Sequence, residues 1–258
     1  MLTVTYRKHG IRLSHVWFAT ENEIINKEYF RNAGDLIFLH ETQCTPDKAI
    51  LYTTQNTLVK DLSPDVDVIF DSLGKHLRSH IRKAEREGIV SIAFYDSQAV
   101  LSDDSLLPTC KRLYEKMFSD KGMESEFNDT LAQKYCELNS LVIAIATIEE
   151  KPIGFCAVIY SGEQSRAWVS GFDFRSGEYD PHIMSRAQRL TNWRRLLWLK
   201  EHGVRWFDFG GINSFDEPNG IAQFKLEFEN ENKITYKNYL VPRTLLGRIG
   251  LWYYMKHR

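Results

Sequence analysis

The chain has 258 residues, 43% of them hydrophobic and 13% aromatic, so it can bury a substantial core as one large domain or two small ones. Its formal net charge of −1 excludes a global basic field for holding nucleic acid, although local basic patches stay open. No segment approaches the roughly 20 apolar residues of a membrane span, and no apolar stretch follows a basic start at the N-terminus. We therefore expect a soluble, globular, cytoplasmic protein.

The metal-binding residue types are dispersed along the chain. The four cysteines form no C-x-x-C pair and are predicted to be reduced packing residues: Cys44, Cys110, Cys136 and Cys156. His76 and His80 form a lone i, i+4 pair without an acidic partner motif. The sequence predicts no metal site.

The first 70 residues are predicted to be β-rich. Apolar side chains alternate or cluster in four short runs separated by turn residues, at 14–18, 35–40, 49–53 and 65–70. Pro64 marks the junction between this front section and the remainder of the chain.

A basic helix is predicted over residues 71–87. Its apolar face consists of Leu73, Leu77, Ile81 and Ala84, and Gly88 ends it. Four cations follow another stripe at helical spacing, namely Lys75, Arg78, Arg82 and Arg86. That stripe is either an ordinary solvated face or a contact for phosphate or another polyanion.

The later chain predicts a β-meander framed by helices. A strand at 89–95 and helices at 103–118 and 128–138 lead into three strands at 141–147, 153–160 and 166–174, which tight turns connect. A helix from Asp180-Pro181 to about His202 follows, then a strand at 205–209, a short amphipathic turn at 224–225 and a strand at 233–240.

The segment from Arg205 to Phe228 carries the densest chemical signal. Its aromatic run W-F-D-F suits a buried strand, and Gly210-Gly211 ends that run where backbone can approach a ligand closely. Lys225 lies just beyond a polar loop that follows the strand.

The element order and these motifs resemble the GNAT superfamily of N-acyltransferases. W-F-D-F-G-G-I followed by N-G-I-A-Q-F-K-L-E-F is similar to the signature of Fem-type peptidoglycan bridge-forming aminoacyltransferases and of related acyltransferases of polysaccharide loci. The basic helix L-G-K-H-L-R-S-H-I-R-K-A-E-R-E-G-I resembles the one that precedes the catalytic half in that group.

The resemblance implies an α+β, GNAT-like fold, with a mixed, mainly antiparallel sheet flanked by helices. We expect a β-rich N-terminal section over 1–70, similar to a truncated GNAT-like domain. A catalytic domain that includes the basic helix is expected over 71–243, followed by an amphipathic C-terminal helix over 244–258.

The resemblance also implies a functional lysine at Lys225, where an ammonium could stabilise an oxyanion or a phosphate. Asp208 is a candidate base with a raised pKa, or a strand residue hydrogen-bonded to nearby backbone. No G-x-S-x-G motif occurs and no cysteine has a catalytic motif, so we expect direct attack by the acceptor amine without a covalent enzyme intermediate.

Two further groups of residues are candidate contacts for the substrates. The donor is expected near the end of the third meander strand, at Asp173, Arg175, Ser176 and Gly177. The candidate substrate-binding residues are Gly210, Gly211, Arg78, Arg82 and Tyr236.

Neither the donor nor the acceptor is fixed by the sequence. Arg175-Ser176-Gly177 is at most a degenerate pyrophosphate loop, and the long coiled-coil insertion of the bridge-forming enzymes is absent. Because the chain is compact and nearly neutral, we favour acyl-CoA as a co-substrate, with no tightly bound cofactor, and an amino group on a cell-envelope precursor or nucleotide-linked amino sugar as acceptor. The alternatives are an aminoacyl-tRNA-dependent enzyme acting on a peptidoglycan precursor and a noncatalytic phosphoglycan-binding protein.

The C-terminal stretch 244–258 combines apolar and aromatic residues with basic ones. It is expected to dock on its own domain, and the alternative is peripheral contact with the inner face of an anionic membrane.

Overall fold

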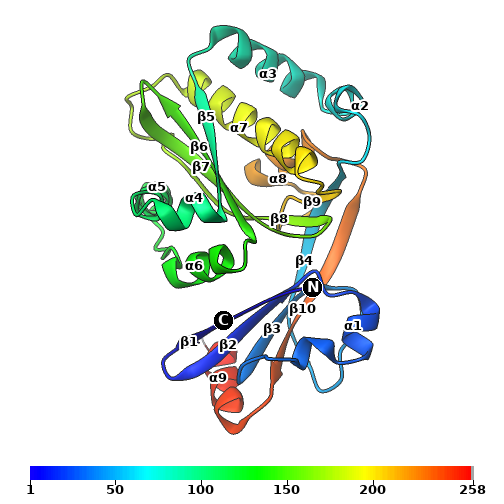
Figure 1. Ribbon diagram of the computed structural model, residues 1–258. Coiled ribbons are helices and arrows are strands. Elements are labelled where there is room, and N and C mark those ends of the chain that lie inside the picture. Colours follow the sequence, from blue (N-terminus) through cyan, green and yellow to red (C-terminus); the bar gives the residue numbers. More distant parts are fainter. Residues whose placement is uncertain (257–258) are drawn as a thin grey trace. The chain divides into compact units, whose positions relative to one another are not determined.

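The computed structural model describes residues 1–256, and Figure 1 shows the elements. The chain forms two compact units whose segments interleave along the sequence. Unit 1 comprises Met1–Thr57, Gly211–Ala222 and Lys233–Arg258, and unit 2 comprises Leu58–Gly210 and Gln223–Asn232. These units are not the consecutive segments 1–70, 71–243 and 244–258 of the sequence-based division, because a late strand pairs with an early one in unit 1.

Unit 1 is a sheet with helices on both faces. Its strands lie in the order β1 (Leu2–Lys8), β2 (Ile11–Trp17), β3 (Leu36–Thr42), β10 (Lys233–Pro242) and the first part of β4 (Ile50–Asp61). Strand alternation divides the apolar side chains of β3 between two clusters. Ile37 and Leu39 pack with the short helices α1 (Glu21–Ile25) and η1 (Glu28–Phe30), whereas Leu36 and Phe38 face the other cluster.

Helix α9 (Leu245–Lys256) covers the second face of this sheet, where Leu251 and Tyr254 join the cluster of Leu36 and Phe38. Two glycines allow the close approach of the helix. A Cβ on Gly247 would lie 1.9 Å from the backbone oxygen of Asp35, and a Cβ on Gly250 would lie 3.3 Å from Ile11. The expected helix 244–258 therefore docks on its own unit over its described length, and residues 257 and 258 lie outside the described residues.

Gly247→Ala is expected to destabilise unit 1 by about 1–3 kcal/mol, because the added methyl overlaps the Asp35 carbonyl and forces α9 away from β3. Urea unfolding followed by circular dichroism would measure the loss. Gly220→Ala is the matched control, since its Cβ would have no neighbour within 4 Å. Equal stability of the two variants would contradict this packing.

Unit 2 contains the predicted meander. Its sheet runs from the last residues of β4 through β9 (Trp206–Asp208), β8 (Gln164–Phe172), β7 (Lys151–Ser161) and β6 (Leu141–Ile148) to β5 (Ser91–Asp96). The pairs β5–β6, β6–β7, β7–β8 and β4–β9 are antiparallel, and β8–β9 is parallel. The expected mixed, mainly antiparallel sheet is confirmed.

Helices flank both faces of this sheet, as Figure 1 shows for unit 2. On one face lie α7 (Pro181–Glu201) and α3 (Lys75–Glu87), and on the other lie α4 (Ser97–Ser102), α5 (Leu106–Ser119) and α6 (Asp129–Glu137). Met184 and Ala187 of α7 pack on Cys156 of β7, while Phe155 points to the opposite face and meets Phe127. The fold is therefore an α+β sandwich of the kind that the resemblance implied.

One predicted strand is wrong. Residues 65–70 are predicted to be extended because apolar side chains alternate or cluster there, but Val66–Asp71 forms helix α2. Only Ile69 of this helix is buried, so the apolar residues of this segment do not pack into a sheet. The basic helix consequently begins at Lys75 rather than at residue 71, after a break at Gly74.

Candidate active site

The candidate site forms where β9 ends and β8 continues. The two strands pair over three positions only, and the last pair joins Arg166 to Asp208. The chain then turns at Gly210, which has a φ of +73° that disfavours other residues. In that turn the Gly210 N–H donates a hydrogen bond to Asp208 Oδ1 at 2.6 Å.

Buried aromatic side chains fix this turn in the core of unit 2. Phe207 and Phe209 are fully buried and meet edge to face with ring centroids 4.8 Å apart. Phe228 packs on Phe209 at 5.6 Å. The aromatic run of the sequence thus anchors both the strand and the segment that carries Lys225.

Lys225 lies in the last turn of helix α8 (Gly220–Leu226), and its Nζ donates a hydrogen bond to the Gly210 carbonyl oxygen at 3.1 Å. The pKa of Lys225 is lowered to about 8, mainly by burial and also by the nearby cations Arg166 and Arg195, while Asp208 acts in the opposite direction. The ammonium therefore loses its proton more readily than a solvated lysine does.

Two arginines that the sequence reading missed complete the cluster. Arg166 follows the turn into β8 and donates to the Ala167 carbonyl at 3.2 Å. Arg195 lies on α7, is only 4% exposed, and donates to Asn192 Oδ1 at 2.5 Å. Its guanidinium also lies 4.5 Å from the centre of the Phe207 ring. The sequence offers one signal for Arg195, because it is a charged residue on the buried face of the long helix α7.

We call Arg166, Asp208, Arg195 and Lys225 the Lys225 cluster. It holds three cationic groups and one carboxylate, so it is electropositive in a setting where water screens charge poorly. Burial also lowers the pKa of Arg195, because its cation is costly to hold inside the protein. Among residues 1–256, the Nε of Arg195 has no hydrogen-bond partner. An anionic group bound at this cluster would relieve that electrostatic cost.

Two ion pairs hold the segment after Lys225 in place. Arg189 of α7 donates two hydrogen bonds to the Glu227 carboxylate, at 2.9 and 2.7 Å. Glu229 forms a buried pair with Lys60 at 3.2 Å and also accepts two backbone N–H groups. The chain that follows Lys225 is therefore held by contacts with two other elements of unit 2, α7 and β4.

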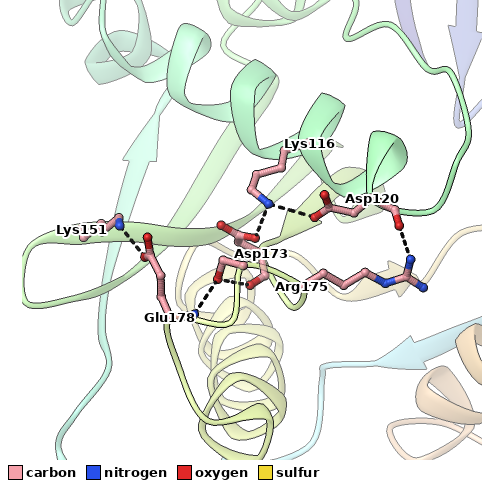
Figure 2. Close-up of polar contacts among 7 residues, drawn as sticks. Lys116, Asp120, Lys151, Asp173, Arg175 and Glu178 are labelled. Atoms are coloured by element: carbon pink, nitrogen blue, oxygen red, sulfur yellow. Dashed lines mark hydrogen bonds and ion pairs between the residues drawn. The ribbon is translucent and has the colours of Figure 1, made fainter.

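The expected donor residues lie on the loop between β8 and α7, where Figure 2 shows Asp173 and Arg175. Lys116 of α5 bridges Asp173 and Asp120 at 3.0 Å each, and Arg175 donates to the Asp120 carbonyl. Ser176 Oγ donates to the Asp173 carbonyl at 3.4 Å, and Gly177 has a φ of +74°. Asp173 and Arg175 thus tie the loop to the end of α5, and a role of these four residues in holding a donor stays a prediction.

The basic helix uses its two expected contact residues for local packing. Arg78 donates to the carbonyls of Leu73, at 2.6 Å, and of Asp71, where α2 ends. The Arg82 guanidinium lies 5.1 Å from the centre of the Phe70 ring. Both residues thereby tie α3 to α2, and substrate binding by them stays a prediction.

The remaining expected residues, Gly211 and Tyr236, belong to unit 1. A Cβ on Gly211 would lie 3.2 Å from the side chain of Gln55, and Tyr236 lies on β10. Of the predicted catalytic and substrate residues, unit 2 brings together Lys225, Asp208 and Gly210.

Residues 1–256 contain neither a metal-binding group nor a membrane-spanning helix. No group of three or more His, Cys, Asp or Glu side chains is arranged to hold a metal ion there. No helix in this part of the chain has the length and hydropathy to span a bilayer. All four cysteines are free, and three of them are buried.

Comparisons with known proteins identify the family of the chain. A family model described as an acetyltransferase (GNAT) domain matches residues 72–226, which is more than half of the chain. No curated protein matches the sequence.

Solved structures share the fold at low sequence identity. FemX has a TM-score of 0.60 at 10% identity, over 97% of this chain and 85% of that one. The C-terminal domain of a putative lysylphosphatidylglycerol synthetase from Agrobacterium fabrum has a TM-score of 0.56 at 11% identity, over 97% and 83%. L-PGS from Bacillus licheniformis has a TM-score of 0.54 at 13% identity, over 98% and 84%. The chain therefore belongs to the GNAT family of acyltransferases, and its fold is similar to that of FemX.

Proposed function

We propose that this protein is an N-acyltransferase that moves an acyl group from acyl-CoA to an amino group on a cell-envelope precursor or a nucleotide-linked amino sugar. The observation that carries this proposal is the Lys225 cluster at the end of β9. Lys225, with its lowered pKa, lies there beside two arginines and one carboxylate. Developing negative charge is best stabilised by cations that are already in place.

The edge of β8 supports a thioester donor. Within residues 1–256, β9 pairs with Gln164 to Arg166 of β8, whereas β8 continues to Phe172. The Ala167 carbonyl accepts from the Arg166 side chain, and the backbone of β8 beyond it offers a strand edge on the β9 side. An extended chain containing amide groups, such as the arm of CoA, can add to such an edge by backbone hydrogen bonds. In this proposal CoA is a co-substrate and not a resident cofactor.

The proposed reaction is a direct attack. The neutral acceptor amine adds to the thioester carbonyl carbon, a C–N bond forms, and the carbonyl oxygen becomes anionic. The Lys225 ammonium stabilises that oxyanion, and Arg166 and Arg195 keep the site positive. The C–S bond then breaks, and the proton lost by the amine ends on the sulfur of CoA.

Asp208 acts in this proposal as a positioning residue. Its Oδ1 accepts the Gly210 N–H and so shapes the turn whose carbonyl holds Lys225. Asp208→Asn keeps an acceptor oxygen and is expected to retain activity within about tenfold, because the turn survives. A general base would instead lose its function, and a rate fall of about 10²-fold or more would identify Asp208 as one.

The rate is expected to fall above pH 8. Below that pH Lys225 is protonated and can stabilise the oxyanion; as pH rises through its pKa of about 8 the charge is lost. Lys225→Arg keeps the positive charge at all these pH values and should remove the alkaline limb, although its geometry lowers the maximal rate. The measurement is the pH profile of CoA thiol release from acetyl-CoA with a panel of nucleotide-linked amino sugars. An alkaline limb unchanged by Lys225→Arg would contradict the assignment.

The second candidate is transfer from aminoacyl-tRNA to a peptidoglycan precursor, favoured by the similarity of the fold to FemX over 97% of the chain. Transfer of a labelled aminoacyl group from charged bulk tRNA, with no CoA release in the acetyl-CoA assay, would select it. Binding of phosphorylated glycans without transfer from either donor, unaffected by Lys225→Ala, would select a noncatalytic binding protein.

A further inference from the structure

Helix α9 displays an apolar and aromatic face in addition to the face that it buries. Six of its side chains point away from unit 1 and are exposed: Leu245, Leu246, Ile249, Trp252, Tyr253 and Met255. Trp252 is 63% exposed and Leu246 is 49% exposed. We call these six residues the α9 face. A contiguous exposed patch of this kind marks an interaction surface more often than scattered apolar residues do.

The α9 face is exposed because the opposite side of the helix packs against the sheet of unit 1. Gly247 and Gly250 bring α9 close to β2 and β3, and Leu251 and Tyr254 join the buried cluster beneath it. Residues of the α9 face follow the i, i+4, i+7 spacing of Leu245, Ile249 and Trp252 on the opposite side. One side of the helix is therefore fixed to the sheet of unit 1, and the α9 face on the other side is exposed to solvent.

The exposed charges on and beside α9 are positive. From Lys233 to Lys256 the sequence contains no Asp or Glu, while Arg243, Arg248 and Lys256 are exposed on or beside α9. The end of β1 adds exposed Lys8, which lies on the same strand face as Tyr6, and Tyr6 joins Leu251 and Tyr254 of α9 in one cluster. An apolar, aromatic stripe with a basic rim is complementary to an anionic bilayer surface.

A second copy of the chain fits this face less well. A helix of 12 residues is only about 18 Å long, and a stable interface needs about 800 Å² from each partner. In a two-fold dimer the same surface would meet itself, so Arg248 and Lys256 would face like charges without any acidic partner on α9. Both considerations disfavour self-association through α9.

We propose that the α9 face docks unit 1 peripherally on an anionic lipid bilayer. Leu245, Leu246, Ile249 and Trp252 enter the boundary between headgroups and acyl chains, and the surrounding cations contact the anionic headgroups. Trp and Tyr suit that boundary because their rings combine an apolar body with a polar group. This inference does not rest on the proposed acyl transfer.

Vesicle sedimentation tests the proposal with the intact protein. Vesicles of equal parts phosphatidylcholine and phosphatidylglycerol are expected to pellet it, and vesicles of phosphatidylcholine alone to pellet it far less. Leu246→Ser and Trp252→Ser should each weaken binding about tenfold or more, and Arg248→Gln about fivefold. Leu138→Ser is the matched control, because Leu138 in unit 2 is also 49% exposed. Its binding should equal that of the parent protein.

A second measurement locates the contact. Lipids carrying a quencher in the acyl chain should quench part of the tryptophan fluorescence, and Trp252→Phe should abolish that part while the protein still sediments. Failure to bind anionic vesicles, or equal binding by Leu246→Ser and Leu138→Ser, overturns the proposal. A dimer in sedimentation equilibrium that Trp252→Ser converts to monomer also overturns it, because a second copy would then occupy the α9 face.

Discussion

Lys225→Met is expected to lower kcat/KM for acetyl transfer by about 10²–10³-fold, the usual effect of removing one group that stabilises an oxyanion. The methionine keeps the length and apolar stem of lysine but has no ammonium to place at the developing charge. Because Lys225 contacts the Gly210 carbonyl and lies among cations, the loss should appear in kcat rather than only in KM. The measurement is CoA thiol release with the best amino-sugar acceptor.

Lys134→Met is the matched control for this substitution, since Lys134 is a partly exposed lysine on α6. It should leave kcat/KM unchanged. The folded state of Lys225→Met should be no less stable than the parent below pH 8, because burial makes the Lys225 cation unfavourable there. A variant that unfolds, or one that keeps full activity, would contradict the role given to Lys225.

Glu229→Ala is expected to lower the free energy of unfolding of unit 2 by about 3–5 kcal/mol, since it leaves the Lys60 ammonium buried without its partner. Lys60 and Glu229 are 6% exposed each, and their charged atoms lie 3.2 Å apart. Glu229 also accepts the N–H groups of Glu231 and Asn232, so its loss releases the turn that follows α8. Urea unfolding followed by circular dichroism would give the change.

Glu231→Ala provides the comparison, because Glu231 is exposed and should change stability by no more than about 0.5 kcal/mol. The double variant Lys60→Met/Glu229→Met should recover part of the loss, since no buried charge is then left unpaired. If Glu229→Ala and Glu231→Ala have the same stability, the buried pair does not hold the segment after Lys225.

Much of unit 2 was predictable from its sequence because its signals are local. The continuous apolar runs of β6 and β7 and the tight turns between them defined the meander, and Asp180-Pro181 marked the start of α7. The pairing of β10 with β3 was not predictable in this way. It joins residues about 200 positions apart in the chain, and no local pattern encodes that distance.

The residues of the candidate site also divide into those with a local sequence signal and those that long-range packing brings in. Lys225, Asp208 and Gly210 were named because they lie within one short motif. Arg166 and Arg195 come from other elements, and the parallel pairing of β8 with β9 and the packing of α7 bring them to the site. The strand predicted at 65–70 is wrong for a different reason, because its apolar side chains form a short helix in which only Ile69 is buried.

The most direct test of the proposed acyl-CoA dependence is a thermal-shift titration of the purified protein with acetyl-CoA, with CoA and with bulk tRNA. A ligand that binds only the folded state at about 100 times its dissociation constant adds roughly 2.7 kcal/mol of stability, a visible rise in Tm. The account predicts this rise with acetyl-CoA and CoA and none with tRNA. A rise with tRNA alone, or no rise with any of the three, would contradict it.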